Sequence, residues 1–405
     1  MNKQPTRRST LLAAAMGVTL VFGAVSQVNA QSMAERNAQR RANKESSKGS
    51  TTKAENQFPN ATRTAPDAKA SSKGGAKLQK MMEFYDKEKA AEARAVADEI
   101  IANTAFNAYE RSFAAQIGAQ LAYDGDDSKA AIAYLKQALE FNGLDNNGHF
   151  GAMFMMAQLQ LQEDQYADSL ATADRFLAET KSTKPEHLIV RGNALYRLER
   201  YPDAAKAIKQ AIDASPEPKV EWQQLLMASY IENNQGADAA KIAEAIAAKT
   251  PNDKRAQMNV AAVYSQADML DKAAVVLEKV RAAGQFTEDK DYRQLYATYL
   301  NLDGKEKEAA GVITEGLEKG VLKPDYQAYV ALAQSYYFSD QTAKSIDAYK
   351  KAAPLAPDGE TYLNLARVLW QEDRIPEAKE AAKQAIAKGV KKPDDANKIL
   401  ALKGK

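Results

Sequence analysis

The chain has 405 residues, of which 27% are charged, and its formal net charge is only +2. This near balance excludes the strongly basic surface that is typical of nucleic-acid-binding proteins. Because the sequence contains no cysteine, it also excludes disulfides, thiolate metal sites and a cysteine nucleophile.

The first thirty residues predict a signal peptide. Lys3, Arg7 and Arg8 precede an apolar run over residues 11–25, and a small-x-small pattern ends at Ala30. The run is weaker and shorter than a segment that spans a bilayer comfortably. We therefore expect cleavage after Ala30, a periplasmic location in a Gram-negative bacterium and no stable membrane span in the mature chain. The Arg7–Arg8 pair leaves open whether export follows the general secretory or the twin-arginine route.

Residues 31–77 predict a disordered basic linker. They contain ten Lys or Arg against four Asp or Glu, with few large apolar side chains. A segment of this composition does not bury enough apolar surface to offset the entropy of ordering it. The linker is interpreted either as a tether for acidic surfaces or as a plain spacer.

From residue 78 onward the sequence is continuously helical in pattern, with small residues at regular intervals. We expect an N-terminal capping helix over 78–104, a repeat array over 105–392, and a C-terminal cap and tail over 393–405. The recurring small residues are Ala131, Ser169, Ala204, Ala239, Ala273, Ala309, Ser345 and Ala378. Another small residue stands twelve positions earlier in most units. This period predicts an all-α solenoid of about eight helix pairs.

Two segments carry a family resemblance. Residues 201–216, "YPDAAKAIKQAIDASP", and 128–143, "SKAAIAYLKQALEFNG", resemble tetratricopeptide repeats, in which small residues mark the contact between the two helices of a unit. The resemblance implies a right-handed α-α superhelix with capping helices. It also implies a concave surface, lined by the first helix of each pair, that binds segments of other proteins.

The sequence offers no catalytic constellation. Its two histidines, His149 and His187, lie in different units, and it has no glycine-rich phosphate loop, zinc-protease motif or serine elbow. We therefore expect a non-catalytic protein without cofactor or metal.

Aromatic, amide and arginine side chains along the first helices predict a groove for a protein or peptide partner. Its candidate residues are Phe154, Gln158, Asn193, Tyr196, Arg197, Asn259, Tyr337, Asn364, Arg367 and Trp370. The alternative is that several of these aromatic side chains pack between adjacent helices. The oligomeric state is left open.

A narrower resemblance concerns the order of elements. A signal peptide, a basic spacer, an opening helix with "KLQK" at 77–80 and a repeat array together are similar to secreted repeat proteins encoded with TonB-type energy transducers. This resemblance implies a periplasmic protein that supports TonB-dependent uptake, often of iron complexes. The alternative is an envelope biogenesis factor that holds a carbohydrate or an enzyme of peptidoglycan, lipopolysaccharide or outer-membrane protein assembly.

Overall fold

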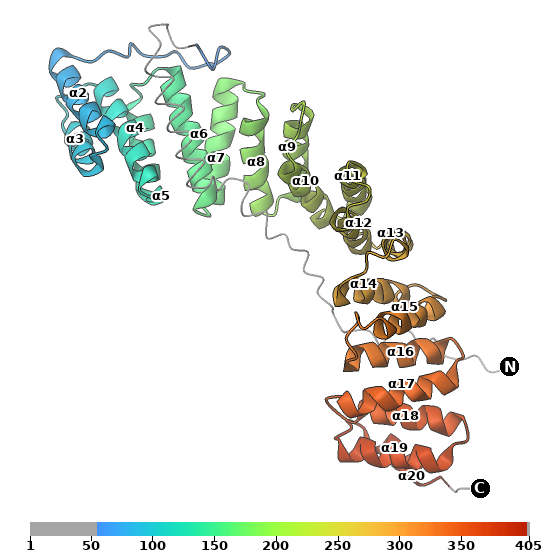
Figure 1. The fold of residues 1–405 in the computed structure, drawn as a ribbon. Coiled ribbons are helices and arrows are strands. Elements are labelled where there is room, and N and C mark those ends of the chain that lie inside the picture. Colours follow the sequence, from blue (N-terminus) through green and yellow to red (C-terminus); the bar gives the residue numbers. More distant parts are fainter. Residues whose placement is uncertain (1–54, 403–405) are drawn as a thin grey trace. The chain divides into compact units, whose positions relative to one another are not determined.

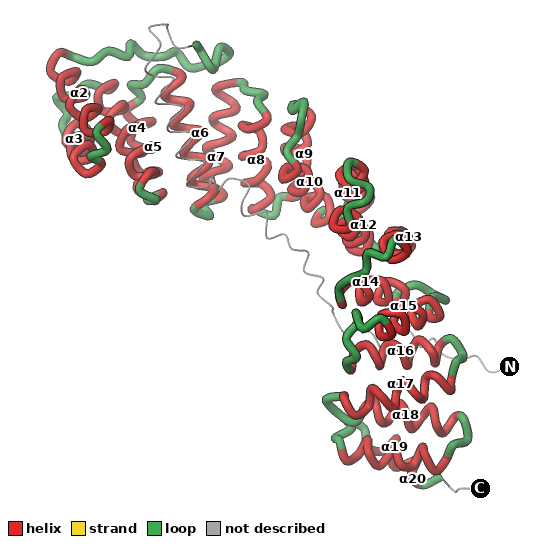
Figure 2. The backbone as a smooth tube through the Cα atoms, in the orientation of Figure 1, coloured by secondary structure: helices red, strands yellow, loops and turns green. Residues whose placement is uncertain are grey.

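The computed structural model describes residues 55–402, and within this range the chain forms nineteen helices and no strand (Figures 1 and 2). The expected all-α fold is therefore confirmed. The helices form two compact units, of which the first ends at Ala239 and the second begins at Ala240. The predicted signal peptide, residues 31–54 of the predicted linker and residues 403–405 lie outside the described residues.

Unit 1 begins with α2 (Ser72–Asp86) and α3 (Ala90–Ala102). Its further helices are α4 (Ala108–Asp124), α5 (Ser128–Phe141), α6 (Asn146–Gln162), α7 (Tyr166–Thr180), α8 (Pro185–Arg197), α9 (Tyr201–Asp213) and α10 (Val220–Glu232). Helix α11 (Gly236–Ala248) contains the boundary between the units. Unit 2 continues with α12 (Lys254–Gln266), α13 (Leu270–Ala282), α14 (Asp289–Leu300), α15 (Glu306–Glu318), α16 (Tyr326–Phe338), α17 (Thr342–Leu355), α18 (Glu360–Gln371), α19 (Ile375–Ala387) and α20 (Pro393–Leu400). Consecutive helices pack against one another in both units (Figure 1).

The small residues of the sequence pattern lie at the contact between the two helices of a pair. All eight are fully buried. Where serine takes this place, its hydroxyl donates a hydrogen bond to the carbonyl of the small residue twelve positions earlier: Ser169 to Ala157 at 2.7 Å and Ser345 to Ala333 at 2.8 Å. The two helix backbones therefore approach closely because no large side chain stands between them. This is the physical basis of the predicted spacing.

The two helices of each pair are joined by a turn of the same conformation. The residue five positions before each buried small residue has a positive φ, and these residues are Asp126, Asp164, Glu199, Asn234, Asp268, Gly304, Asp340 and Asp373. A left-handed residue after a helix redirects the chain and lets the next amide donate back to the helix, as Gln341 does to the carbonyl of Tyr336 at 2.8 Å. The acidic and amide residues in these turns tolerate this conformation better than most side chains.

The structure differs from the sequence-based boundaries at the N-terminal cap. Residues 78–104 were expected to form one helix, but α2 begins at Ser72 and a turn at Glu88, with φ of 58°, separates it from α3. Met81 and Ala93, twelve positions apart, are both fully buried. The cap is thus a further helix pair in the same register, and its turn was missed because "DKEK" contains neither glycine nor proline.

The end of the predicted linker is also ordered in the structure. Residues 55–71 run in an extended course along unit 1 and lead into α2, and Phe58 of this segment is buried (Figure 1). This corrects the expectation of disorder for residues 55–77. At the other terminus α20 packs on α18 and α19, as expected of a C-terminal cap. None of the described helices combines the length and the apolar character needed to cross a membrane.

Candidate functional site

The first helices of the pairs form a layer in which the predicted groove residues lie. In unit 1 α8 contacts both α6 and α10, and in unit 2 α18 contacts α20. Unit 1 carries Phe154, Gln158, Asn193, Tyr196 and Arg197 in α6 and α8, whereas unit 2 carries Asn259, Tyr337, Asn364, Arg367 and Trp370 in α12, α16 and α18. The ten residues are therefore divided equally between the two units, and each group is described separately.

The groove candidates of unit 1 are engaged by their own chain. The ring of Phe154 lies 5.4 Å from that of Phe176 and 4.6 Å from that of His187. Phe154 thus packs between adjacent helices, which was the alternative for the aromatic candidates. Asn193 is buried, and Gln158 is half-buried.

The other two candidates of unit 1 also have partners in α7 and in the second helix of their pair. Tyr196 packs edge-on against Tyr201, with ring centroids 5.6 Å apart. The guanidinium of Arg197 lies 4.5 Å from the ring centroid of Tyr166 and 3.3 Å from a carboxylate oxygen of Asp164. These contacts hold both side chains against their own chain.

Unit 2 carries a group of exposed aromatic side chains. Phe338 is 59% exposed and Trp370 is 46% exposed. Tyr337 packs edge-on against Phe338, with centroids 5.3 Å apart, and its hydroxyl donates a 2.9 Å hydrogen bond to Oε1 of Gln371. Tyr337 and Trp370 stand at equivalent positions of α16 and α18. We call Tyr337, Phe338, Trp370 and Gln371 the aromatic face.

A charged cluster lies on α18, the same helix that carries Trp370. Arg367 donates to Oδ1 of Asn364 at 3.1 Å and forms a 2.8 Å ion pair with Asp395 of α20. Hydrogen bonds from Arg367 and Lys398 lower the pKa of the Asp395 carboxyl. Asn259 is exposed on α12. The amide and guanidinium groups of α18 supply both donors and acceptors, but no reactive pair of groups.

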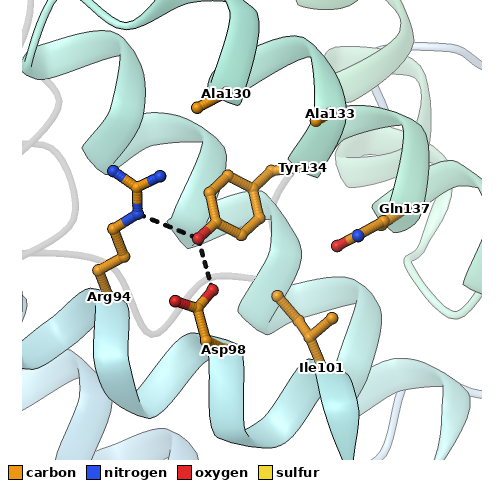
Figure 3. A pocket seen from close by; sticks show the side chains of 7 residues that line it. All are labelled: Arg94, Asp98, Ile101, Ala130, Ala133, Tyr134 and Gln137. Carbon is orange, nitrogen blue, oxygen red and sulfur yellow. Dashed lines mark hydrogen bonds between the residues drawn. The ribbon is translucent and has the colours of Figure 1, made fainter.

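A shallow cavity of about 280 Å³ lies elsewhere, between α3 and α5 of unit 1 (Figure 3). Arg94 and Asp98 of α3 meet Tyr134 of α5: the tyrosine hydroxyl donates to Oδ1 of Asp98 at 2.5 Å and accepts from Nε of Arg94 at 3.1 Å. Burial raises the pKa of Tyr134. The cavity contains no nucleophile poised beside a base, and among the described residues no cluster of histidine and carboxylate side chains could hold a metal ion.

Sequence reasoning missed two features of the surface. Gln371 was not among the candidates, although it fixes the hydroxyl of Tyr337. Phe58 and Arg63 were assigned to the linker, yet both contact unit 1. The available signal was that Phe58 is the single aromatic residue between positions 31 and 77.

Family models identify the repeats. Two tetratricopeptide repeat models match the chain, one over residues 154–217 and the other over 326–358. The first match covers part of α6 and all of α7 to α9, and the second covers α16 and α17. The chain therefore contains tetratricopeptide repeats in both units. Repeats of this family support a role as a protein–protein interaction scaffold, and the fold is typically non-catalytic.

Solved structures with a similar fold include other repeat proteins. A tetratricopeptide repeat protein from Parabacteroides merdae is 16% identical, with a TM-score of 0.39, over 64% of this chain and 98% of its own. The C-terminal part of a TPR repeat-containing protein from Cytophaga hutchinsonii is 16% identical, with a TM-score of 0.46, over 62% of this chain and 100% of its own. MamA from Desulfovibrio magneticus, from residue 41 to its end, is 16% identical, with a TM-score of 0.34, over 42% of this chain and 92% of its own. No curated protein matches the chain.

Proposed function

We propose that the chain is a non-catalytic scaffold whose aromatic face in unit 2 holds a segment of a partner protein. The observation that carries this proposal is the exposure of Phe338 on α16, which lies in a matched repeat, and of Trp370 on α18, the first helix of the next pair. Large apolar side chains that remain in water are the ones that gain most from burial by a partner. Tryptophan and tyrosine are also the residues that most often dominate the energy of such contacts.

The polar groups beside the aromatic face give the contact its chemistry. Gln371 already holds the hydroxyl of Tyr337, and Asn364 and Arg367 lie on the same helix as Trp370. Amide side chains can hydrogen-bond the main chain of a bound segment, and apolar side chains of that segment can cover Phe338 and Trp370. The proposed ligand is therefore a polypeptide segment with apolar anchors.

The proposed setting is the periplasm, where the scaffold would support TonB-dependent uptake. This part rests on the signal-peptide pattern of residues 1–30 and on the resemblance of the order of elements to secreted repeat proteins encoded with TonB-type transducers.

The test of the aromatic face is crosslinking in intact cells. The chain is expressed with its own N-terminus and a C-terminal tag, crosslinked, and its captured proteins are identified. The variant Phe338→Ala/Trp370→Ala should capture the partner at least about tenfold less, as expected for the loss of dominant contact residues. The matched control is Leu355→Ala, which removes another half-exposed apolar side chain of unit 2. Equal capture by the double variant and the wild type would contradict the assignment.

The same experiment tests the setting. Capture of a TonB-type transducer or its membrane partners supports the uptake proposal. Capture of wall-synthesis or outer-membrane assembly proteins would contradict uptake and leave the scaffold as such intact. Recovery of the chain in the cytoplasmic fraction, and not in the periplasmic fraction, would contradict the proposed location.

A further inference from the structure

A segment that precedes the helices lies across unit 1 like a bound peptide. Residues 55–66, which we call the strap, follow the course from α2 toward α7 (Figure 1). Most side chains of the strap are exposed, and the contacts with unit 1 concentrate at Phe58 and Arg63. The connection from Thr64 to Ala70 is exposed throughout. The buried part of the strap is therefore confined to these two anchor points. The exposed segment that joins it to α2 contacts unit 1 at Lys69, whose carbonyl accepts a 3.0 Å hydrogen bond from the side chain of Asn107.

The first anchor is an aromatic cluster. The ring of Phe58 lies 5.3 Å from that of Phe150 and 5.7 Å from that of Phe176, both in edge contact, and it stacks on the ring of His187 at 6.1 Å. Phe150 and Phe176 belong to α6 and α7 and are fully buried with the strap in place. Edge contacts of this kind add to the apolar area that is buried. Phe58 thus adds a ring from outside the helices to an aromatic cluster that the helices form.

Two asparagines at the start of α6 form hydrogen bonds with the main chain of the strap. Asn147 accepts from the amide of Gln57 at 3.0 Å and donates to the carbonyl of Glu55 at 2.8 Å. Asn146 donates to the carbonyl of Arg63 at 3.1 Å. These contacts use only backbone groups of the strap, so they do not depend on its side chains. They lie on either side of a turn in which the amide of Ala61 donates to the carbonyl of Phe58 at 3.1 Å.

The second anchor is a cradle of oxygen atoms for a guanidinium group. Arg63 donates to Oδ1 of Asn146 at 2.8 Å, to Oδ1 of Asn142 at 2.8 Å and to the carbonyl of Leu144 at 3.0 Å. The amide of the preceding residue, Thr62, donates to the carbonyl of Glu179 at 2.8 Å. Several fixed acceptors in a fork-like arrangement favour arginine over lysine.

We propose that this site is a second peptide-binding site, distinct from the aromatic face, and that it takes a segment of a partner protein in which a tight turn separates an aromatic residue from an arginine five positions later. The strap is its resting occupant. The asparagine pair recognises the backbone, while the aromatic cluster and the cradle select the two anchors. Release of the strap requires no helix to unfold, because the exposed connection is the only link to α2.

The experiment converts the strap into a separable ligand within the folded, full-length chain. A protease recognition sequence is inserted between Pro66 and Asp67, both exposed, and the folded chain is cleaved there. A fluorescent peptide of residues 55–66 is then added, and its binding is followed by anisotropy. We expect the peptide to replace the strap, and to bind the uncleaved chain at least about tenfold more weakly, because a tethered strap competes at an effective concentration of roughly millimolar.

Matched peptides test the chemistry. Phe58→Ala or Arg63→Ala in the peptide should each weaken binding about tenfold or more. Gln57→Ala should leave it unchanged, because Gln57 is exposed and contacts Asn147 through its backbone amide. If the insertion disturbs folding, the intact chain with Phe58→Ala/Arg63→Ala is tested with the same peptides, and its helix content is checked by circular dichroism.

Three outcomes overturn the proposal. The cleaved strap stays bound and never exchanges, the strap leaves but no peptide binds in its place, or the two anchor substitutions have no effect. A wild-type chain that forms a strap-exchanged dimer would also overturn it, because the occupant in trans would then be a second copy of this chain.

Discussion

Unit 1 and unit 2 present their aromatic residues to the surroundings in opposite ways. In unit 1, Phe58 from the strap covers Phe150 and Phe176, so that the cluster is closed by the chain itself. In unit 2, Phe338 and Trp370 remain exposed, while the hydroxyl of Tyr337 donates a hydrogen bond to Gln371 within the aromatic face. Whether an aromatic residue of a repeat is exposed or buried therefore depends on whether a segment distant in the sequence packs on it.

The largest expected effect concerns a feature that both units share. In each unit the backbone of one segment approaches a glycine of another segment closely. A Cβ at Gly143 would lie 2.2 Å from the carbonyl of Ala108, and one at Gly359 would lie 2.0 Å from that of Ala385. Backbone atoms cannot yield locally, so each glycine-to-alanine change should cost about 3 kcal/mol or more of unfolding free energy in its own unit. Hydrogen exchange resolved by unit, during urea unfolding, measures this cost.

The controls for these variants are Gly151 and Gly311, which lie in helices α6 and α15. A Cβ at either position would meet nothing within 4 Å. Alanine there should be neutral or should stabilise the helix by up to about 1 kcal/mol. If all four variants behaved alike, close approach would not be the feature that the two units share.

The second effect sharpens the difference between the units. Phe58→Ala should destabilise unit 1 by about 3 kcal/mol, because a buried ring is removed from an aromatic cluster. Trp370→Ala should cost unit 2 less than about 1 kcal/mol, since roughly half of its side chain is already in water. The measurement is again urea unfolding with hydrogen exchange. Equal costs would show that the exposed tryptophan is part of the core.

The third effect compares two arginines. Arg63→Ala should cost about 2 kcal/mol, because several fixed acceptors lose a charged donor. Arg367 forms one ion pair with Asp395 in which both side chains are about two-fifths exposed, so Arg367→Ala should cost at most about 0.5 kcal/mol. Thermal unfolding of both variants, at low and at high salt, distinguishes the two cases. A strong salt dependence for Arg367→Ala alone would reverse this ranking.

The sequence predicts the repeat array well because its information is local and periodic. Ala204 and its equivalents occur at nearly constant intervals, and a small residue at this place lets the two helices of a pair pack closely. The turn residues, such as Asp340 and Asp373, follow the same period. Each unit repeats the same local signals, so the fold class could be predicted.

The strap and the state of the groove residues could not be predicted in this way. The contact of Phe58 with Phe150 and Phe176 joins residues about a hundred positions apart, and no periodicity relates them. Phe154, for which the sequence left open a groove position or packing between helices, packs against Phe176 and His187. The polar composition of residues 31–77 also hides the two anchors, because a composition averages over single residues such as Phe58 and Arg63.

The smallest expected effect is a pH dependence confined to unit 1. Both histidines of the chain lie there, and burial lowers the pKa of His149 and of His187 to about 4. In the unfolded chain their pKa is near 6.5. As the pH falls from 6.5 toward 4, the unfolded chain binds protons that the folded unit does not, so the stability of unit 1 decreases in this window.

The decrease should be about 1 kcal/mol between pH 7 and pH 5.5, a value reduced for the water near these partly solvated rings. Unit 2 contains no histidine, and its paired carboxylates begin to lose stability only below their unfolded pKa of about 4, so it should be unchanged over the same range. Hydrogen exchange of each unit at pH 7 and pH 5.5, corrected for the intrinsic exchange rate, measures both. The variant His187→Gln should remove part of the dependence in unit 1. Equal dependence in the two units would mean that the aromatic cluster around Phe58 does not exclude water from His187.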